Sequence, residues 1–163
     1  ISYLQAQIEA GAQIVMVFDT WGGNLSTKDY ETFSLAYSRK ISHALQATNP
    51  SVPRLLFTKG AGVWLETMAD AGYNGLGVDW TTDLKLAREL TKDSVVLQGN
   101  LDPTSLYASP EKIRQKVRDV LADYGHGHKH IFNLGHGILP DINPEHVKAM
   151  IDEVHQSSPA YHQ

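Results

Sequence analysis

The fold is decided by residues 94–137, which read SVVLQGNLDPTSLYASPEKIRQKVRDVLADYGHGHKHIFNLGHG. The run at residues 94–98 is short and rich in valine, which predicts a strand. A helix is predicted at residues 110–124, because Ser109 is a favourable cap and a proline follows at the first helical position. A second short strand is predicted at residues 131–134. Two strands joined by a helix predict a parallel pair, since parallel strands need a crossover connection.

The same alternation continues through the rest of the chain. The other predicted strands lie at residues 12–18, 55–58 and 75–79, and the other predicted helices at residues 3–8, 28–47, 63–71, 83–90 and 144–155. Short, nearly all-apolar strands are typical of a parallel sheet buried on both faces, so we expect an α/β fold in a single domain over residues 1–163. Periodicity does not distinguish an open sheet from part of a closed barrel. In both cases functional residues follow the carboxyl ends of the strands.

Composition excludes several classes of protein. The net charge is −4 and the basic residues are scattered, so no nucleic-acid partner is expected. No apolar run approaches the roughly 20 residues that cross a bilayer, and no export signal is present, so we expect no membrane partner and a cytoplasmic location. The absence of cysteine excludes disulfides, thiolate nucleophiles and cysteine-bound zinc. The chain begins with Ile1 within an apolar-periodic segment, which we interpret as a fragment boundary, although N-terminal processing would produce the same start.

Polar residues follow all five predicted strands, as expected of a functional site. Any one of them could be an ordinary loop residue, but five in register with strand ends favour a site. His136 is the strongest candidate, because histidine titrates near neutral pH and can donate, accept or neutralise a carboxylate. Asp79 and Asp102 are expected to cap neighbouring loops. The positions are Asp19 and Thr20, Lys59, Asp79 and Trp80, Gln98 to Asp102, and Gly135-His136-Gly137.

Three alternating histidines raise a metal hypothesis, which we reject on geometry. His126 and His128 precede the fifth strand, whereas His136 follows it, and eight extended residues span roughly 25 Å. His128 and His136 therefore cannot share an ion. His126 and His128 could pair, but no acidic partner lies nearby, and we expect them in a solvated loop at the opposite face. No nucleotide-binding, nucleophile-elbow or zinc-protease motif is present, so a site without metal or cofactor is the simplest interpretation.

The residues after the strands resemble those of a known family. The matching strings are FDTWGGNL at 18–25, FTKG at 57–60, GVDWT at 77–81, QGNLDP at 98–103, NLGHG at 133–137 and PEH at 144–146. In this order they closely resemble the C-terminal half of uroporphyrinogen decarboxylases, and the resemblance covers essentially the whole chain. QGNLDP and NLGHG are specific strings, and DTWGG resembles the bacterial version.

The resemblance implies a (β/α)8 barrel of the TIM type, of which this chain supplies about the last five βα units, and a homodimer. It implies decarboxylation of the four acetate side chains of uroporphyrinogen III to give coproporphyrinogen III, without metal or cofactor. Thr20 and His136 match substrate-contacting positions, and His136 is also a candidate for proton delivery. The family's arginine motif, central aspartate and active-site tyrosine lie upstream and are absent from this chain, which is therefore expected to be inactive alone.

Two alternatives remain open. The same superfamily includes zinc-dependent corrinoid methyltransferases, which use a cluster of histidine and cysteine. The absence of cysteine argues against this alternative. A non-catalytic barrel module that binds porphyrin weakly is the second, and the intact strings around Thr20 and His136 argue against it.

Overall fold

Five parallel strands form the sheet of the computed structural model, which describes residues 1–162. The strands pair in chain order, β1-β2-β3-β4-β5, and each neighbouring pair is parallel. The predicted α/β class and the crossover connections are confirmed. The strands are β1 Val15–Asp19, β2 Arg54–Thr58, β3 Gly75–Gly77, β4 Val96–Leu101 and β5 His130–Leu134.

Helices connect successive strands. The α-helices are α1 Ser2–Glu9, α2 Thr27–Tyr30, α3 Ala36–Thr48, α4 Leu65–Ala69, α5 Leu84–Thr91, α6 Pro110–Tyr124 and α7 Pro144–Ser157. Short 3-10 helices occupy Gly22–Asn24, Gly62–Trp64, Pro103–Tyr107 and Ser158–Ala160. None of the helices in the described chain combines the length and apolar character needed to cross a bilayer.

Most element boundaries agree with the sequence, and two differ in an informative way. The predicted helix over residues 28–47 is divided, because a π-helical segment at Glu31–Leu35 separates α2 from α3. β4 continues to Leu101, three residues beyond its predicted end at Gln98. Gln98 therefore lies within the strand rather than at its end, and its side chain is positioned by the sheet.

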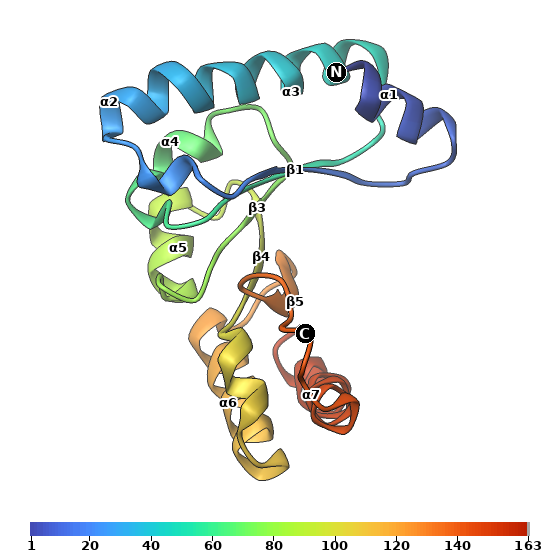
Figure 1. Ribbon diagram of the computed structural model, residues 1–163, viewed down its shortest axis with the longest axis vertical. Helices are drawn as coiled ribbons and strands as arrows, with labels where there is room; N and C mark the ends of the chain where they lie inside the picture. Colours follow the sequence, from blue (N-terminus) through green and yellow to red (C-terminus); the bar gives the residue numbers. More distant parts are fainter. Residues whose placement is uncertain (163) are drawn as a thin grey trace.

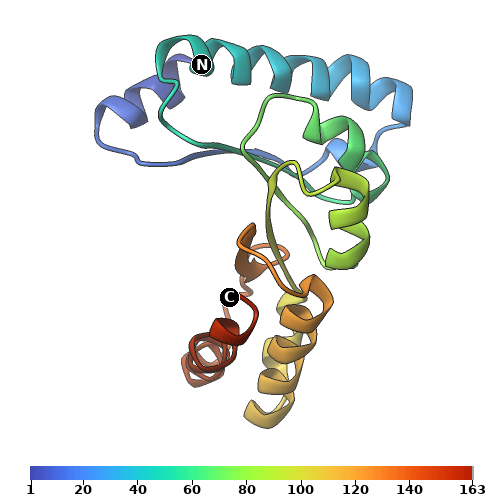
Figure 2. The same cartoon turned by 180° about the vertical axis from the view of Figure 1, so that it is seen from behind.

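Helices cover one side of the sheet. α3, α4, α5 and α6 lie one after another along this side (Figures 1 and 2). The main core lies beneath them, where Leu56, Leu76 and Leu97 from three adjacent strands are almost completely buried. Burial of each such side chain stabilises the fold by about 1.5–3 kcal/mol, so this contact fixes the sheet against its helices.

The opposite side of the sheet carries a row of side chains from neighbouring strands. Phe18, Phe57, Gly77 and Gln98 are successive register partners across β1 to β4, and partners in register point to the same side. Phe18 is 69% exposed although it is a large aromatic residue. This open face is where the cavity described below lies.

A buried carboxylate joins the last two helices of the fold. Glu153 in α7 is 4% exposed, and its Oε1 accepts hydrogen bonds from Arg118 of α6 at 2.8 Å and from the Ser157 hydroxyl at 2.7 Å. Arg114 lies 3.8 Å from Oε2. The Ser157 hydroxyl and the two guanidinium groups hold the pKa of Glu153 below its usual value, against the opposing effect of burial.

Replacing Glu153 with Gln should lower the free energy of unfolding of the intact protein by about 2 kcal/mol at pH 7, because a hydrogen-bonded charged group is lost. The folded-state pKa lies below 4.5, so this contribution is complete above about pH 4.5 and is lost as the pH falls through the lowered pKa. Urea unfolding at a series of pH values measures the difference between wild type and variant. A difference that does not shrink in acid would contradict the assignment.

The matched control for this experiment is Asp152→Asn. Asp152 neighbours Glu153 in the chain but lies at the surface, where it pairs with Lys148. Exposed pairs of this kind contribute little to stability. The control should therefore unfold at nearly the same urea concentration as the wild type.

Candidate functional site

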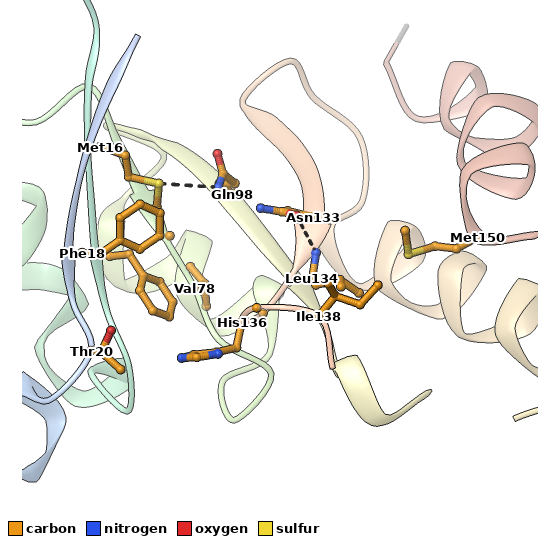
Figure 3. Close-up of a pocket in the computed structure, with 14 residues that line it drawn as sticks. Met16, Phe18, Thr20, Val78, Gln98, Asn133, Leu134, His136, Ile138 and Met150 are labelled. Atoms are coloured by element: carbon orange, nitrogen blue, oxygen red, sulfur yellow. Dashed lines mark hydrogen bonds between the residues drawn. The ribbon is translucent and has the colours of Figure 1, made fainter. Parts of the chain in front are cut away.

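A cavity of about 560 Å³ opens on the face of the sheet that carries Phe18 and Phe57, and extends to the loops after the strands. Its walls are mostly apolar, with a few polar side chains among them (Figure 3). Such a cavity at the carboxyl ends of parallel strands is the expected place for a ligand. The lining residues are Met16, Phe18, Thr20, Phe57, Gly77, Val78, Gln98, Asn133, Leu134, Gly135, His136, Gly137, Ile138 and Met150.

Thr20 and His136 both line this cavity, as the sequence predicted. Thr20 follows β1 directly, and His136 lies in the loop after β5, so the two strands at the edges of the sheet supply them. Figure 3 shows the His136 ring directed toward the side on which Thr20 lies. The predicted convergence of these residues, 116 positions apart in the chain, is therefore confirmed. Their contact with a substrate stays a prediction.

Aromatic rings surround the imidazole of His136. The ring of Phe57 lies 6.0 Å from it and that of Trp80 lies 6.4 Å from it, between centroids, both in edge-on geometry. Lys59 places its ammonium group 5.6 Å from the centre of the Trp80 ring, which is a cation–π contact. His136 is the only ionisable side chain among the described residues that line the cavity. Any charge there thus depends on this imidazole.

Asp79 fixes the loops that surround His136. Its buried carboxylate accepts hydrogen bonds from the backbone N–H of Gly60 and, at 2.8 Å, from that of Thr81. The amide of Asn100 in β4 donates to the Asp79 carbonyl at 3.0 Å and to the Thr82 carbonyl at 2.6 Å. The loops after β2 and β3 and the end of β4 are thus tied together. The prediction that Asp79 is structural is confirmed.

Gln98, Gly135 and Gly137 also line the cavity, whereas other predicted positions lie around it. Asp102 accepts from the backbone N–H of Thr104 at 2.9 Å, which confirms its predicted capping role. Asp19 accepts a hydrogen bond from the Ser34 hydroxyl. Lys59 and Trp80 contact each other, and Trp80 supports His136 from outside the cavity. These residues position the site, and they are not among its lining groups.

The sequence did not indicate three side chains that shape the cavity: Met16, Asn133 and Met150. Gln98, which was among the predicted positions, does line it. Met16 and Asn133 were regarded only as parts of strands. The alternation of side chains along β1 and β5 could have identified Met16 and Asn133, once one lining residue of each strand was known. Met150 comes from α7 and carries no local signal, because only the tertiary packing brings it to the cavity.

The histidines before β5 lie apart from this site. His126 and His128 are exposed, as predicted. His130 stacks on Tyr124 at 4.5 Å between ring centroids, and its Nε2 lies 2.8 Å from the Gly99 carbonyl oxygen. Burial lowers the pKa of His130. Among residues 1–162 no group of three or more His, Cys, Asp or Glu side chains is arranged to hold a metal ion.

The fold and the cavity define a class of protein, in which a parallel sheet of βα units carries a site at the carboxyl ends of its strands. Comparison with known proteins narrows this class. The family model described as Uroporphyrinogen decarboxylase (URO-D) matches residues 1–157. The chain therefore belongs to the uroporphyrinogen decarboxylase family.

Individual relatives agree with the family match. The chain is 59% identical over 161 residues to a uroporphyrinogen decarboxylase from Methylococcus capsulatus, with 98% of this chain and 46% of that protein covered. It is 60% identical over 164 residues to the same-named protein of Alkalilimnicola ehrlichii, with 99% and 45% covered. The chain thus spans about half the length of the curated relatives that it matches.

A solved structure shares the fold. A methyltransferase from Methanosarcina mazei aligns with a TM-score of 0.80 and 26% sequence identity, and the alignment covers 96% of this chain and 45% of that one. The arrangement of five parallel strands and their helices thus occurs within a longer protein that is named a methyltransferase. The fold alone does not select between the two activities.

Gly135→Ala should displace the loop that carries His136. A Cβ atom at residue 135 would lie 2.6 Å from the backbone nitrogen of Trp80, too close without movement of the backbone. We expect the free energy of unfolding of the intact protein to fall by about 1–3 kcal/mol, as for other overpacked positions. Gly137→Ala is the matched control, because nothing lies within 4 Å of a Cβ at that position. Equal destabilisation of both variants, measured by thermal unfolding, would contradict the role given to Gly135.

Proposed function

We propose that this chain carries half of the active site of a uroporphyrinogen decarboxylase, which converts uroporphyrinogen III to coproporphyrinogen III. The reaction removes the carboxyl groups of four acetate side chains. The single observation that supports this most is the convergence of Thr20 and His136 on one cavity, at positions that match the family's motifs. The identity of nearly 60% to relatives of that name supports it independently.

The chemistry of the cavity suits a pyrrole substrate. A proton added to a carbon of the electron-rich ring turns the ring into an electron sink, which accepts the electron pair of the breaking carbon–carbon bond. Carbon dioxide leaves, and a second proton converts the resulting methylene group to methyl. The ring carbon then loses the first proton, which restores the pyrrole, so that one proton is consumed for each carboxyl group removed. Apolar walls favour the neutral ring system, while His136 can bind an acetate or deliver a proton and Thr20 can donate a hydrogen bond to a side chain.

The groups that this cavity lacks define what the rest of the protein contributes. The described lining residues include no Arg, Lys, Asp or Glu, yet the substrate is polyanionic and its protonated ring needs a stabilising carboxylate. We place these groups in the part of the relatives' length that this chain does not span. The same part would add the strands that close a (β/α)8 barrel over the open face around Phe18. A cytoplasmic homodimer that needs no metal or cofactor completes the proposal.

The methyltransferase alternative receives its support from the fold of the Methanosarcina mazei protein. A zinc site built from histidine and cysteine cannot form from this sequence, because it contains no cysteine. Metal analysis of the purified intact protein discriminates between the two. One zinc ion per chain would favour methyl transfer, and uroporphyrinogen turnover in metal-free protein would favour decarboxylation. Porphyrin binding without turnover would favour a non-catalytic module.

His136→Gln should reduce kcat/KM for uroporphyrinogen III in the intact protein by about ten-fold or more, because a hydrogen bond to a charged group is worth roughly 1.5–3 kcal/mol. Thr20→Val should reduce it by a smaller factor. The control His128→Gln removes an exposed histidine outside the cavity and should leave the rate unchanged. Formation of coproporphyrinogen, followed by chromatography after oxidation, measures these rates. Full activity in His136→Gln would exclude the proposed role.

Residues 1–163 purified alone should not decarboxylate uroporphyrinogen III. We expect this fragment to aggregate as well, because Phe18 on the open face is 69% exposed and an uncovered sheet edge invites pairing. Turnover assays and size-exclusion chromatography measure both properties against the intact protein. A monomeric fragment that melts cooperatively would contradict the second expectation, and measurable turnover would contradict the first.

A further inference from the structure

Two neutral amides face the cavity at the end opposite Thr20 and His136. Gln98 projects from β4 and Asn133 from β5, and both line the cavity. Figure 3 shows Thr20 and His136 at one end and the two amides at the other, with the amide nitrogen of Asn133 directed toward Gln98. The cavity therefore has two polar ends with apolar and aromatic walls between them.

The backbone fixes the orientation of the Asn133 amide. Its Oδ1 accepts a hydrogen bond from the N–H of Leu134 at 2.9 Å. Since a backbone N–H must meet an oxygen, this bond leaves the NH2 group as the free end of the side chain. No residue between 1 and 162 accepts a hydrogen bond from this group. Two donor hydrogens of Asn133 thus remain for a ligand.

Gln98 is only weakly engaged. Its Nε2 donates to the thioether sulfur of Met16 at 3.8 Å, and a thioether is a weak acceptor. A better acceptor that enters the cavity would replace this sulfur at little cost. The Gln98 amide, which is only partly buried, can therefore turn its donor to a ligand.

We propose that Gln98 and Asn133 form an amide clamp that binds one carboxylate side chain of the substrate. This inference rests on the proposed function, which supplies a substrate with carboxylates on every pyrrole ring. The two oxygens of a carboxylate accept from the two NH2 groups, and hydrogen bonds to a charged acceptor are the stronger kind. A methyl group in the same place makes no such bond. The clamp therefore selects side chains that still carry their carboxyl group.

The clamp consists of neutral groups only and lies apart from the ionisable group of the cavity. His136 is the ionisable group of the lining and lies at the other end, near the rim with Lys59 and Trp80 outside it. A neutral clamp orients a carboxylate without a strong ion pair, so the product can leave after the reaction. Recognition at two ends also fixes the rotation of a ring system about its axis, which a single contact cannot do.

Two variants test the clamp in the intact protein. Gln98→Met removes the donor with little change of shape and no change of charge. Asn133→Asp keeps the oxygen that accepts from Leu134, so the local backbone is preserved, but replaces the donor with a negative charge. We expect Gln98→Met to raise KM for uroporphyrinogen III about ten-fold and Asn133→Asp to raise it further, with kcat within about two-fold of wild type. Gln156→Glu, at an exposed position of α7, is the control and should change neither constant.

A second readout does not depend on turnover. Fluorescence titration with uroporphyrin, the oxidised octacarboxylate, should give a dissociation constant about ten-fold higher in Gln98→Met than in wild type. Unchanged KM and unchanged uroporphyrin affinity in both variants would overturn the clamp, as would a loss of kcat at constant KM. If the wild type binds uroporphyrin but does not decarboxylate uroporphyrinogen III, the proposed function fails, while the uroporphyrin affinities of the variants still test the clamp. If the wild type binds no uroporphyrin, the clamp fails too.

Discussion

The buried carboxylate of Asp79 is the contact on which the site depends. It accepts hydrogen bonds from the backbone N–H groups of Gly60 and Thr81, and the backbone carbonyl of Asp79 accepts one from the side-chain amide of Asn100. A carboxylate at this depth is stable only because these donors replace the water that it lost. Removing it would leave several backbone groups unsatisfied at once. The order of the loops after β2 and β3 therefore rests on this one carboxylate, while the backbone carbonyl of Asp79 ties in the end of β4.

The position of His136 follows from this contact. Trp80 is the next residue after Asp79, and its ring packs edge-on to the imidazole. The backbone at Asp79 and Trp80 also lies against Gly135, so closely that no side chain fits at position 135. The histidine is thus held by an aromatic ring and by the close contact of the residue before it, although its ring makes no hydrogen bond with any residue between 1 and 162. Such a group is oriented yet free to bind a ligand.

The sequence predicted the order and type of the elements because local signals were strong. Ser109 with Pro110 and Asn143 with Pro144 marked two helix starts, and the Asn143 side chain does accept from the backbone N–H of Glu145. Strand ends were harder, since β4 continues through Gly99 and Asn100, residues that usually favour turns. Their place in the strand is set by pairing with β5, which no local pattern reveals. Thr20 and His136 were predictable because they follow strands and belong to specific strings. Gln98 was predictable for the same reason of position, whereas Met150 was not, because only helix packing brings it to the cavity.

The distribution of charge over the cavity bears on how a site divided between two halves of a protein can function. The lining contributed by this chain is neutral except for one imidazole. A polyanionic ligand would gain little Coulomb energy from such a surface, so its affinity must come from directed hydrogen bonds and from contact with Phe18 and Phe57. Cations on the wall supplied by the other half of the protein would then attract the ligand whatever its orientation. The wall supplied by this chain would determine the orientation in which the ligand binds. On this view, weakening the neutral wall changes which substituent is presented for reaction, and weakening the charged wall changes whether the ligand binds at all.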